Sequence, residues 1–135
     1  MPSRITPDSN ILFSALVFGG NPLRLIEMAL GGEVLLFISE AILHETLRVL
    51  REKFDFPEER AARAEEYISE ATTLVQPSNK IDAIKEDPDD NKILECAEAA
   101  GCEYIVTGDL DLLRLGEYGE IRIVTVRAFL DQRTK

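Results

Sequence analysis

Two acidic residues follow segments of the chain that should form strands. Asp8 comes after the short segment 4–6, and Asp109 comes soon after the compact apolar segment 104–106. In open α/β sheets the carboxyl ends of the strands are where reactive groups gather, so both carboxylates are expected at one edge. Carboxylate oxygens are the ligands that Mg²⁺ and Mn²⁺ prefer. Either residue alone could equally serve as an Asx turn or a helix cap.

A third carboxylate, Asp90, faces the apolar side of its predicted helix. At ~100° per residue, Asp90 projects inside the arc formed by Ile93, Leu94, Cys96, Ala97 and Ala100. A carboxylate turned toward a sheet must be paired, protonated or bound to a metal. The alternative is a stabilising helix start, with Asp87 as cap, Pro88 in the first turn and acids near the helix N-terminus. Asp89 lies near the edge of the same arc, so spacing separates it only weakly from Asp90.

Glu45 lies at the boundary between core and solvent on a long predicted helix. The core stripe of this helix is Ile42, Leu43, Thr46, Leu47, Val49 and Leu50, and Glu45 projects ~40° beyond its edge. Taken alone, Glu45 is better explained as a solvated residue near enough to Arg48 to pair weakly. Glu45 becomes a candidate site residue only when it is considered together with the other three acids.

Asp8, Glu45, Asp90 and Asp109 form a set that a divalent cation would stabilise. Carboxylates gathered in a partly dry crevice raise one another's pKa and cost stability, and a hard cation removes that conflict. A metal held in this way can activate a water and stabilise a phosphodiester undergoing in-line attack. Zinc is not expected, because the two cysteines form no CxxC pair and the single histidine, His44, is predicted to lie on the surface.

The elements that must position these acids alternate between strand-like and helix-like apolar periodicity. Strands are predicted at 4–6, 33–38, 73–76, 104–106 and 121–125, and helices at 10–18, 21–30, 39–53, 57–72, 87–100, 110–115 and 126–132. Residues 77–86 are polar and irregular, with one helical turn at 81–84. Pro7 suits the last residue of the first strand, because proline cannot donate a ladder hydrogen bond.

Strands separated by helices pair in parallel through right-handed crossovers. The pattern therefore predicts an α/β fold, a three-layer α/β/α sandwich with a central, mostly parallel sheet. With 135 residues and no linker or repeat, we expect a single domain over 1–135.

Composition bounds the function less sharply. The hydrophobic content of 45% is enough for a core, and no apolar run approaches the ~18 residues of a membrane span, so we expect a soluble, reduced, cytoplasmic chain that binds no membrane. The net charge of −10, from 25 acidic and 15 basic residues, argues against broad attraction to nucleic acid. Carboxylates collected for a metal count as negative until the cation reverses the local field, so a nuclease is not excluded. Lys92 and Arg24 are the basic residues expected near the site, although a solvated face explains each more simply.

Four segments together resemble the PIN-domain family of metal-dependent ribonucleases. They are Asp8-Ser9-Asn10-Ile11-Leu12 with Ser14-Ala15-Leu16, Ser39-Glu40-Ala41-Ile42-Leu43-His44-Glu45, Asp87-Pro88-Asp89-Asp90-Asn91-Lys92-Ile93-Leu94, and Ile105-Val106-Thr107-Gly108-Asp109-Leu110-Asp111-Leu112-Leu113. The segments run in the family's order over nearly the whole chain.

The resemblance implies metal-ligand or water-activating roles for Asp8, Glu45, Asp90 and Asp109. It implies supporting hydrogen bonds from Asn10 and Thr107, and outer positions for Asp87 and Asp111. The activity implied is a Mg²⁺- or Mn²⁺-dependent endoribonuclease that leaves a 5′ phosphate and a 3′ hydroxyl. Family members commonly form homodimers, and many are toxins held inactive by a cognate antitoxin, so an RNA substrate, an antitoxin protein and a second copy of the chain are the partners implied.

Two other functions remain open from the sequence. A non-catalytic PIN-like module that binds protein or RNA partners would share the fold, although the four-acid set argues against it. A phosphoacceptor signalling domain is also α/β and acid-rich, but it needs a lysine at a late strand end, and Ile121-Arg122-Ile123-Val124 supplies none.

Overall fold

The computed structural model describes residues 1–81 and 90–133. Strands and helices alternate along most of the chain, as the periodicity predicts. The order is β1 (Ser3–Pro7), α1 (Ser9–Phe18), α2 (Gly20–Leu30), β2 (Val34–Ile38), α3 (Glu40–Glu52), α4 (Glu58–Ala71), β3 (Thr72–Leu74), α5 (Asn91–Ala99), β4 (Tyr104–Val106), α6 (Leu110–Leu115), β5 (Glu117–Tyr118), β6 (Ile121–Val124) and α7 (Val126–Arg133).

The strands form one six-stranded sheet in the order β3-β2-β1-β4-β6-β5. Every pairing is parallel except that of β5 with β6, which is antiparallel. β1 and β4 are neighbours at the centre, although about a hundred positions separate them in the chain. The predicted mostly parallel sheet is confirmed.

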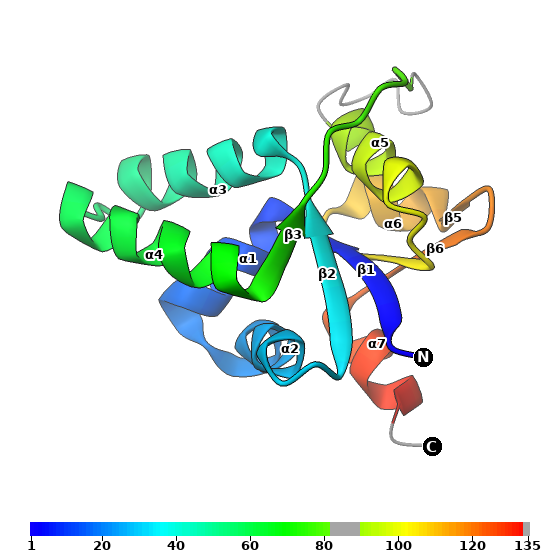
Figure 1. The fold of residues 1–135 in the computed structure, drawn as a ribbon, viewed down its shortest axis with the longest axis horizontal. Helices are drawn as coiled ribbons and strands as arrows, with labels where there is room; N and C mark the ends of the chain where they lie inside the picture. The colour runs from blue at the N-terminus through cyan, green and yellow to red at the C-terminus, as the bar shows by residue number, and fades with distance from the viewer. Residues whose placement is uncertain (82–89, 134–135) are drawn as a thin grey trace.

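Helices cover both faces of the sheet. Figure 1 shows α1 to α4 on one side of the central strands and α5 and α6 on the other, while α7 packs against α2. This division follows from right-handed crossovers, because the chain moves outward from β1 to β3 on one face and returns to β4 on the other. The three-layer α/β/α arrangement is confirmed.

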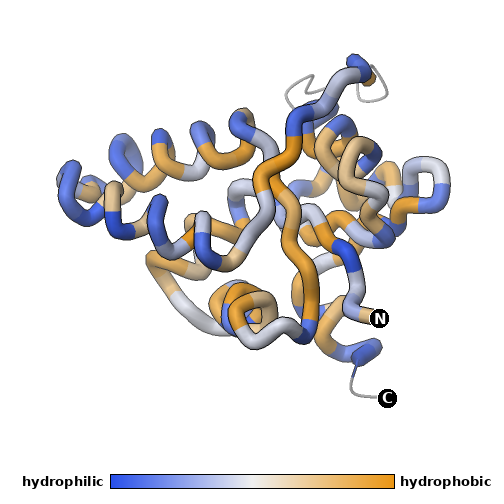
Figure 2. Tube along the Cα trace, in the orientation of Figure 1, coloured by the Kyte–Doolittle hydropathy of each residue, from blue (hydrophilic) through white to orange (hydrophobic). Residues whose placement is uncertain are grey.

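The core lies between the sheet and these helix layers. Ile5, Leu36 and Ile105, from the three central strands, are at most 2% exposed. Figure 2 shows the apolar strands inside and the hydrophilic stretches on the outer turns of α3 and α4. Cys96 and Cys102 are both buried and free, and burial raises the pKa of the Cys96 thiol to about 12. Both cysteines therefore serve as small apolar core residues.

Proline has no N–H to donate to a neighbouring strand. Pro7 is tolerated in this central strand because it lies beyond the last residue of β1 that pairs with β2. The β1–β2 register ends at the pair Ile5 and Leu36, two residues before Pro7. On the other side Pro7 lies opposite Val106, the last residue of β4. Pro7 is therefore the last residue of its strand, as predicted, and its missing N–H leaves the β1–β2 ladder intact.

Several boundaries differ from the prediction. α2 begins at Gly20, one residue before the predicted start at 21, and Gly19 is its N-cap. β3 ends at Leu74 rather than at 76, and the two-residue strand β5 was not predicted. α3 begins at Glu40 rather than at 39, because Ser39 is its N-cap and its hydroxyl accepts from the Ile42 N–H at 3.3 Å. The helical turn predicted at 81–84 extends into 82–89, which lies outside the described residues. The predicted cap Asp87 lies in the same range.

Among the described residues, no single helix has the length and apolar character needed to cross a membrane. The pair α1 and α2 reaches that length together, but the two helices are bent by 103° at their junction.

Candidate metal centre

The site begins where β1 and β4 end side by side. Pro7 and Val106 are partners in register, and the Asp8 N–H donates to the Val106 carbonyl at 2.9 Å. Asp8 and Thr107 therefore emerge from adjacent strand ends at one sheet edge, as the topology of an open α/β sheet requires. Both are buried, Asp8 at 4% and Thr107 at 0% exposure.

The Asp8 carboxylate is held by donors from both strand ends. Its Oδ1 accepts from the Ser9 N–H at 2.7 Å, and its Oδ2 accepts from the Thr107 hydroxyl at 2.7 Å and the Asn10 amide at 3.1 Å. Burial is the main influence on this group and raises the pKa of Asp8 above its ordinary value. The hydrogen bonds from Thr107 and Ser9 oppose that rise, and the charges of Glu45 and Asp109 add to it.

Thr107 and Asn10 connect the residues that follow β1 to those that follow β4 through hydrogen bonds. The Thr107 hydroxyl oxygen accepts from the Asp109 N–H at 2.9 Å while its proton points to Asp8. The Asn10 side-chain oxygen accepts from the Gly108 N–H at 3.1 Å. These contacts fix the loop that presents Asp109, which is the kind of supporting position that the resemblance implies for Thr107 and Asn10.

Glu45 reaches the site through Ser9. The Ser9 hydroxyl donates to Glu45 Oε2 at 2.7 Å, while Glu45 Oε1 lies 3.8 Å from an Arg48 guanidinium nitrogen. The Glu45 side chain is 42% exposed, which places it at the boundary between core and solvent as predicted. Sequence reasoning did not single out Ser9. The available signal was its position directly after Asp8, at the start of a predicted helix.

A second acidic group gathers at the starts of α5 and α6. Carboxylate oxygens of Asp90, Asp109 and Asp111 all lie within 4.8 Å of one another. Asp90 precedes α5 and is 9% exposed, whereas Asp109 and Asp111 are half-buried. Three convergent carboxylates at this spacing suit a hard divalent cation with oxygen ligands. Asp111 also lies 3.1 Å from Arg114, a more exposed neighbour on the same helix.

The structure therefore arranges the predicted acids in two adjoining halves. Asp8 and Glu45 are joined by Ser9, and Asp90 and Asp109 converge with Asp111, which the resemblance had implied only as an outer residue. The Thr107 hydroxyl links the two halves, because it donates to the Asp8 carboxylate and accepts from the Asp109 N–H. Asp87 and Asp89 lie outside the described residues.

The simpler structural roles considered for these acids are also present. Asp8 caps α1 through the Ser9 N–H, and Asp109 caps α6 through its Oδ2, which accepts from the Leu112 N–H at 3.0 Å. At Asp109 the cap uses Oδ2 and leaves electron pairs on Oδ1, whereas Oδ2 of Asp8 already accepts from Thr107 and Asn10, so a cation there would bind Oδ1 beside the Ser9 bond. Capping therefore does not exclude metal coordination at either residue.

The two basic residues expected near the site, Lys92 and Arg24, lie in different places in the structure. Lys92 is an exposed residue of α5 two positions after Asp90, and it lines a pocket that Glu45 also lines. Arg24 is exposed on α2 and does not line that pocket. His44 is exposed on α3, as predicted, on the rim of the same pocket.

A mostly parallel α/β sheet with carboxylates converging beyond its strand ends is an arrangement compatible with a metal-dependent nuclease-type domain. A family model described as "PIN domain" matches residues 4–111, four-fifths of the chain, including all the predicted acids. The chain belongs to the PIN-domain family. A search of curated proteins found no match.

Proposed function

We propose that this chain is a metal-dependent endoribonuclease that hydrolyses RNA phosphodiester bonds. The observation that carries the proposal is the convergence of Asp90, Asp109 and Asp111 oxygens within 4.8 Å, beside the buried Asp8. Membership of a nuclease-type family supports the same reading. RNA as the substrate, the metal and the catalytic role of each acid are parts of the proposal.

Mg²⁺ or Mn²⁺ fits the donor set, because the converging groups are carboxylate oxygens without sulfur or imidazole. We assign Asp90, Asp109 and Asp8 to metal binding, with Asp111 as a further ligand. When bound, the cation would supply an activated water and stabilise charge on the phosphodiester.

In this proposal the chain's own residues orient the carboxylates and accept a proton from the attacking water. Thr107 and Asn10 hold Asp8 Oδ2 in one position, and Ser9 holds Glu45 Oε2. In this proposal Glu45, half-exposed and anchored through one oxygen, would accept a proton from an attacking water, while its other oxygen faces Arg48. The products would carry a 5′ phosphate and a 3′ hydroxyl.

The toxin role is a finer proposal that rests on the resemblance. We propose that the chain is the toxin of a toxin–antitoxin pair, acts as a homodimer and folds as one domain over 1–135. Co-purification of a short DNA-binding protein encoded next to this chain, with loss of cleavage in the complex, would support it. Cleavage unaffected by such a protein would count against it.

Metal-dependent cleavage is the direct test of the activity. Single-stranded RNAs of varied sequence, labelled at the 5′ end, should be cut in Mg²⁺ or Mn²⁺ and left intact in EDTA. In a parallel reaction with RNA labelled at the 3′ end, the labelled fragments carry the new 5′ end and should be degraded by an exonuclease that requires a 5′ phosphate. If a folded chain binds these RNAs but cuts none of them with either metal, the function is that of a non-catalytic binding module.

A further inference from the structure

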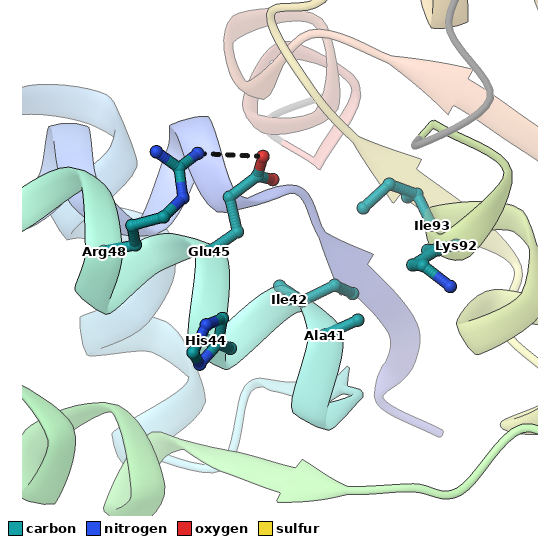
Figure 3. A pocket seen from close by; sticks show the side chains of 7 residues that line it. All are labelled: Ala41, Ile42, His44, Glu45, Arg48, Lys92 and Ile93. Atoms are coloured by element: carbon teal, nitrogen blue, oxygen red, sulfur yellow. Dashed lines mark ion pairs between the residues drawn. The ribbon is translucent and has the colours of Figure 1, made fainter.

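A pocket adjoins both halves of the acidic site. It has a volume of about 250 Å³ and is lined by Ala41, Ile42, His44, Glu45, Arg48, Lys92 and Ile93. Its walls come from α3 and α5, and Figure 3 shows Glu45 and Arg48 on the α3 side with Lys92 and Ile93 on the α5 side. Glu45 belongs to one acidic half, and Ile93 lies three residues after Asp90 of the other, on the same side of α5.

The pocket is basic at its rim although the chain is strongly acidic. Among the lining residues Arg48 and Lys92 contribute two positive charges and Glu45 one negative charge, and Glu52 outside the lining also pairs with Arg48, in a chain whose net charge is −10. Both basic side chains are on exposed residues, so they remain accessible to a ligand. An anion that approaches the acidic site therefore meets two cations directly beside it.

The floor of the pocket is apolar. Ile42 and Ile93 are 1% and 3% exposed, and Ala41 adds a small side chain at the opening. The volume of 250 Å³ is slightly below the ~300–1,000 Å³ typical of small-molecule pockets. The charge and lining of the pocket suit one nucleotide, which has an anionic phosphate and an apolar face and would extend beyond the pocket.

Arg48 is positioned to exchange partners when the acidic site is loaded. It lies 3.8 Å from Glu45 and 3.6 Å from Glu52, with 43% of its side chain exposed. Such exposed pairs hold a side chain only weakly. If Glu45 turns its charge toward a cation and an attacking water, Arg48 becomes available to a phosphate oxygen, which it can contact in bidentate fashion.

We propose that this pocket binds the nucleotide next to the scissile phosphate of a single-stranded RNA. Arg48 and Lys92, on opposite walls, contact the phosphates on either side of this nucleotide, and Ile42 and Ile93 contact its sugar and base. The inference rests on the proposed ribonuclease function for its substrate class, and it assigns specificity to residues outside the acidic set.

The test measures RNA affinity separately from cleavage. A fluorescent single-stranded RNA would be titrated with the parent chain in Ca²⁺, and binding followed by anisotropy at several salt concentrations. Arg48→Gln and Lys92→Gln should each weaken binding roughly tenfold, as expected for loss of a charge-assisted contact. Each should also lower the salt dependence by about 0.7 in the log–log slope, the value for one phosphate on a single strand.

Two further variants distinguish the pocket from general electrostatics. Ala41→Trp fills the opening without changing charge and should weaken binding to a similar degree, and circular dichroism would confirm that it folds. Arg63→Gln removes an exposed positive charge on α4, outside the pocket, and should leave affinity and salt slope unchanged.

The outcomes separate this proposal from the ribonuclease proposal. If the parent binds RNA and the three pocket variants weaken binding, the pocket is supported even when no cleavage is seen, and only the ribonuclease function fails. If the parent cleaves RNA but Arg48→Gln, Lys92→Gln and Ala41→Trp bind as the parent does, the pocket proposal is overturned. Failure of the parent to bind RNA overturns it as well.

Discussion

The Ser9 hydroxyl donates a 2.7 Å hydrogen bond to Glu45 Oε2, joining the first helix to the third across 36 positions of sequence. Ser9 also donates its N–H to Asp8, so one residue orients two carboxylates of the candidate site. This relationship gives Glu45, a half-exposed helical residue, a fixed place beside a buried one.

Ser9→Ala should lower RNA cleavage without unfolding the chain. The variant removes the donor to Glu45 but keeps the Ser9 N–H bond that Asp8 accepts. A hydrogen bond to a charged group contributes ~1.5–3 kcal/mol, which corresponds to a loss of roughly tenfold or more in rate if the bond persists in the transition state. Single-turnover cleavage measures it, with Ser14→Ala on the same helix as the matched control. Equal cleavage rates for Ser9→Ala and Ser14→Ala would show that Ser9 has no role in the site.

Thr107→Val should destabilise the fold at the joined strand ends. The Thr107 hydroxyl bonds the Asp8 carboxylate and the Asp109 N–H and is fully buried. Valine has a similar shape but leaves those groups without this partner, so we expect a loss of ~1–3 kcal/mol in the free energy of unfolding. Urea denaturation would measure it. Thr107→Ser keeps the hydroxyl and should recover most of the loss; a valine variant as stable as the parent would contradict the account.

Asp8 should make stability depend on pH in a defined direction. Burial raises its folded-state pKa above the ordinary value of 3.8, so the folded chain holds the proton more tightly than the unfolded chain. The stability from this group is full below pH 3.8 and is lost as pH rises through the folded-state pKa. Asp8→Asn lacks this titration and keeps a capping side chain.

The measurement is the free energy of unfolding of the parent minus that of Asp8→Asn, in EDTA, from acid to neutral pH. This difference should fall as pH rises above 3.8. A difference that stays flat or grows with pH would show that burial does not govern the Asp8 carboxylate.

Asp111→Asn should weaken cation binding. Its carboxylate converges with those of Asp90 and Asp109, so removal of its charge takes a ligand from the group. We expect the Mn²⁺ dissociation constant, measured by calorimetry, to rise about 10- to 100-fold, the range found even for supporting residues of metal sites. Arg114→Gln removes the partner of Asp111 but no carboxylate, and serves as the control. Unchanged affinity in Asp111→Asn would show that Asp111 is not a metal ligand.

Much of the fold follows from sequence because alternating apolar patterns and crossover handedness leave few arrangements. The adjacency of Asp8 and Thr107 follows from two strand ends meeting. β5 was missed because two residues, Glu117 and Tyr118, are too few to show a strand period. α2 was expected to start at Asn21, but the positive φ values of Gly19 and Gly20 let the chain turn earlier.

The finer arrangement of the site could not be predicted from spacing alone. The Ser9 bond to Glu45 depends on the packing of α1 against α3, which no local pattern encodes. The convergence of Asp111 with Asp90 depends on how α6 begins beside α5, and a helix of six residues is too short for periodicity to show which way Asp111 faces. Sequence identified the acids, and packing determined their grouping.

The central claim is that the converging carboxylates hold the metal that cuts RNA. The most direct measurement compares cleavage of end-labelled RNA by the parent, Asp109→Asn and Asp55→Asn in Mg²⁺ and Mn²⁺. Asparagine can still cap α6, so Asp109→Asn should fold normally yet lose roughly a hundredfold or more in rate, because a bound metal contributes several kcal/mol. Asp55 is exposed with a φ of 54°, which asparagine tolerates, so Asp55→Asn should cut like the parent. Cleavage by Asp109→Asn at the rate of the parent would contradict the account.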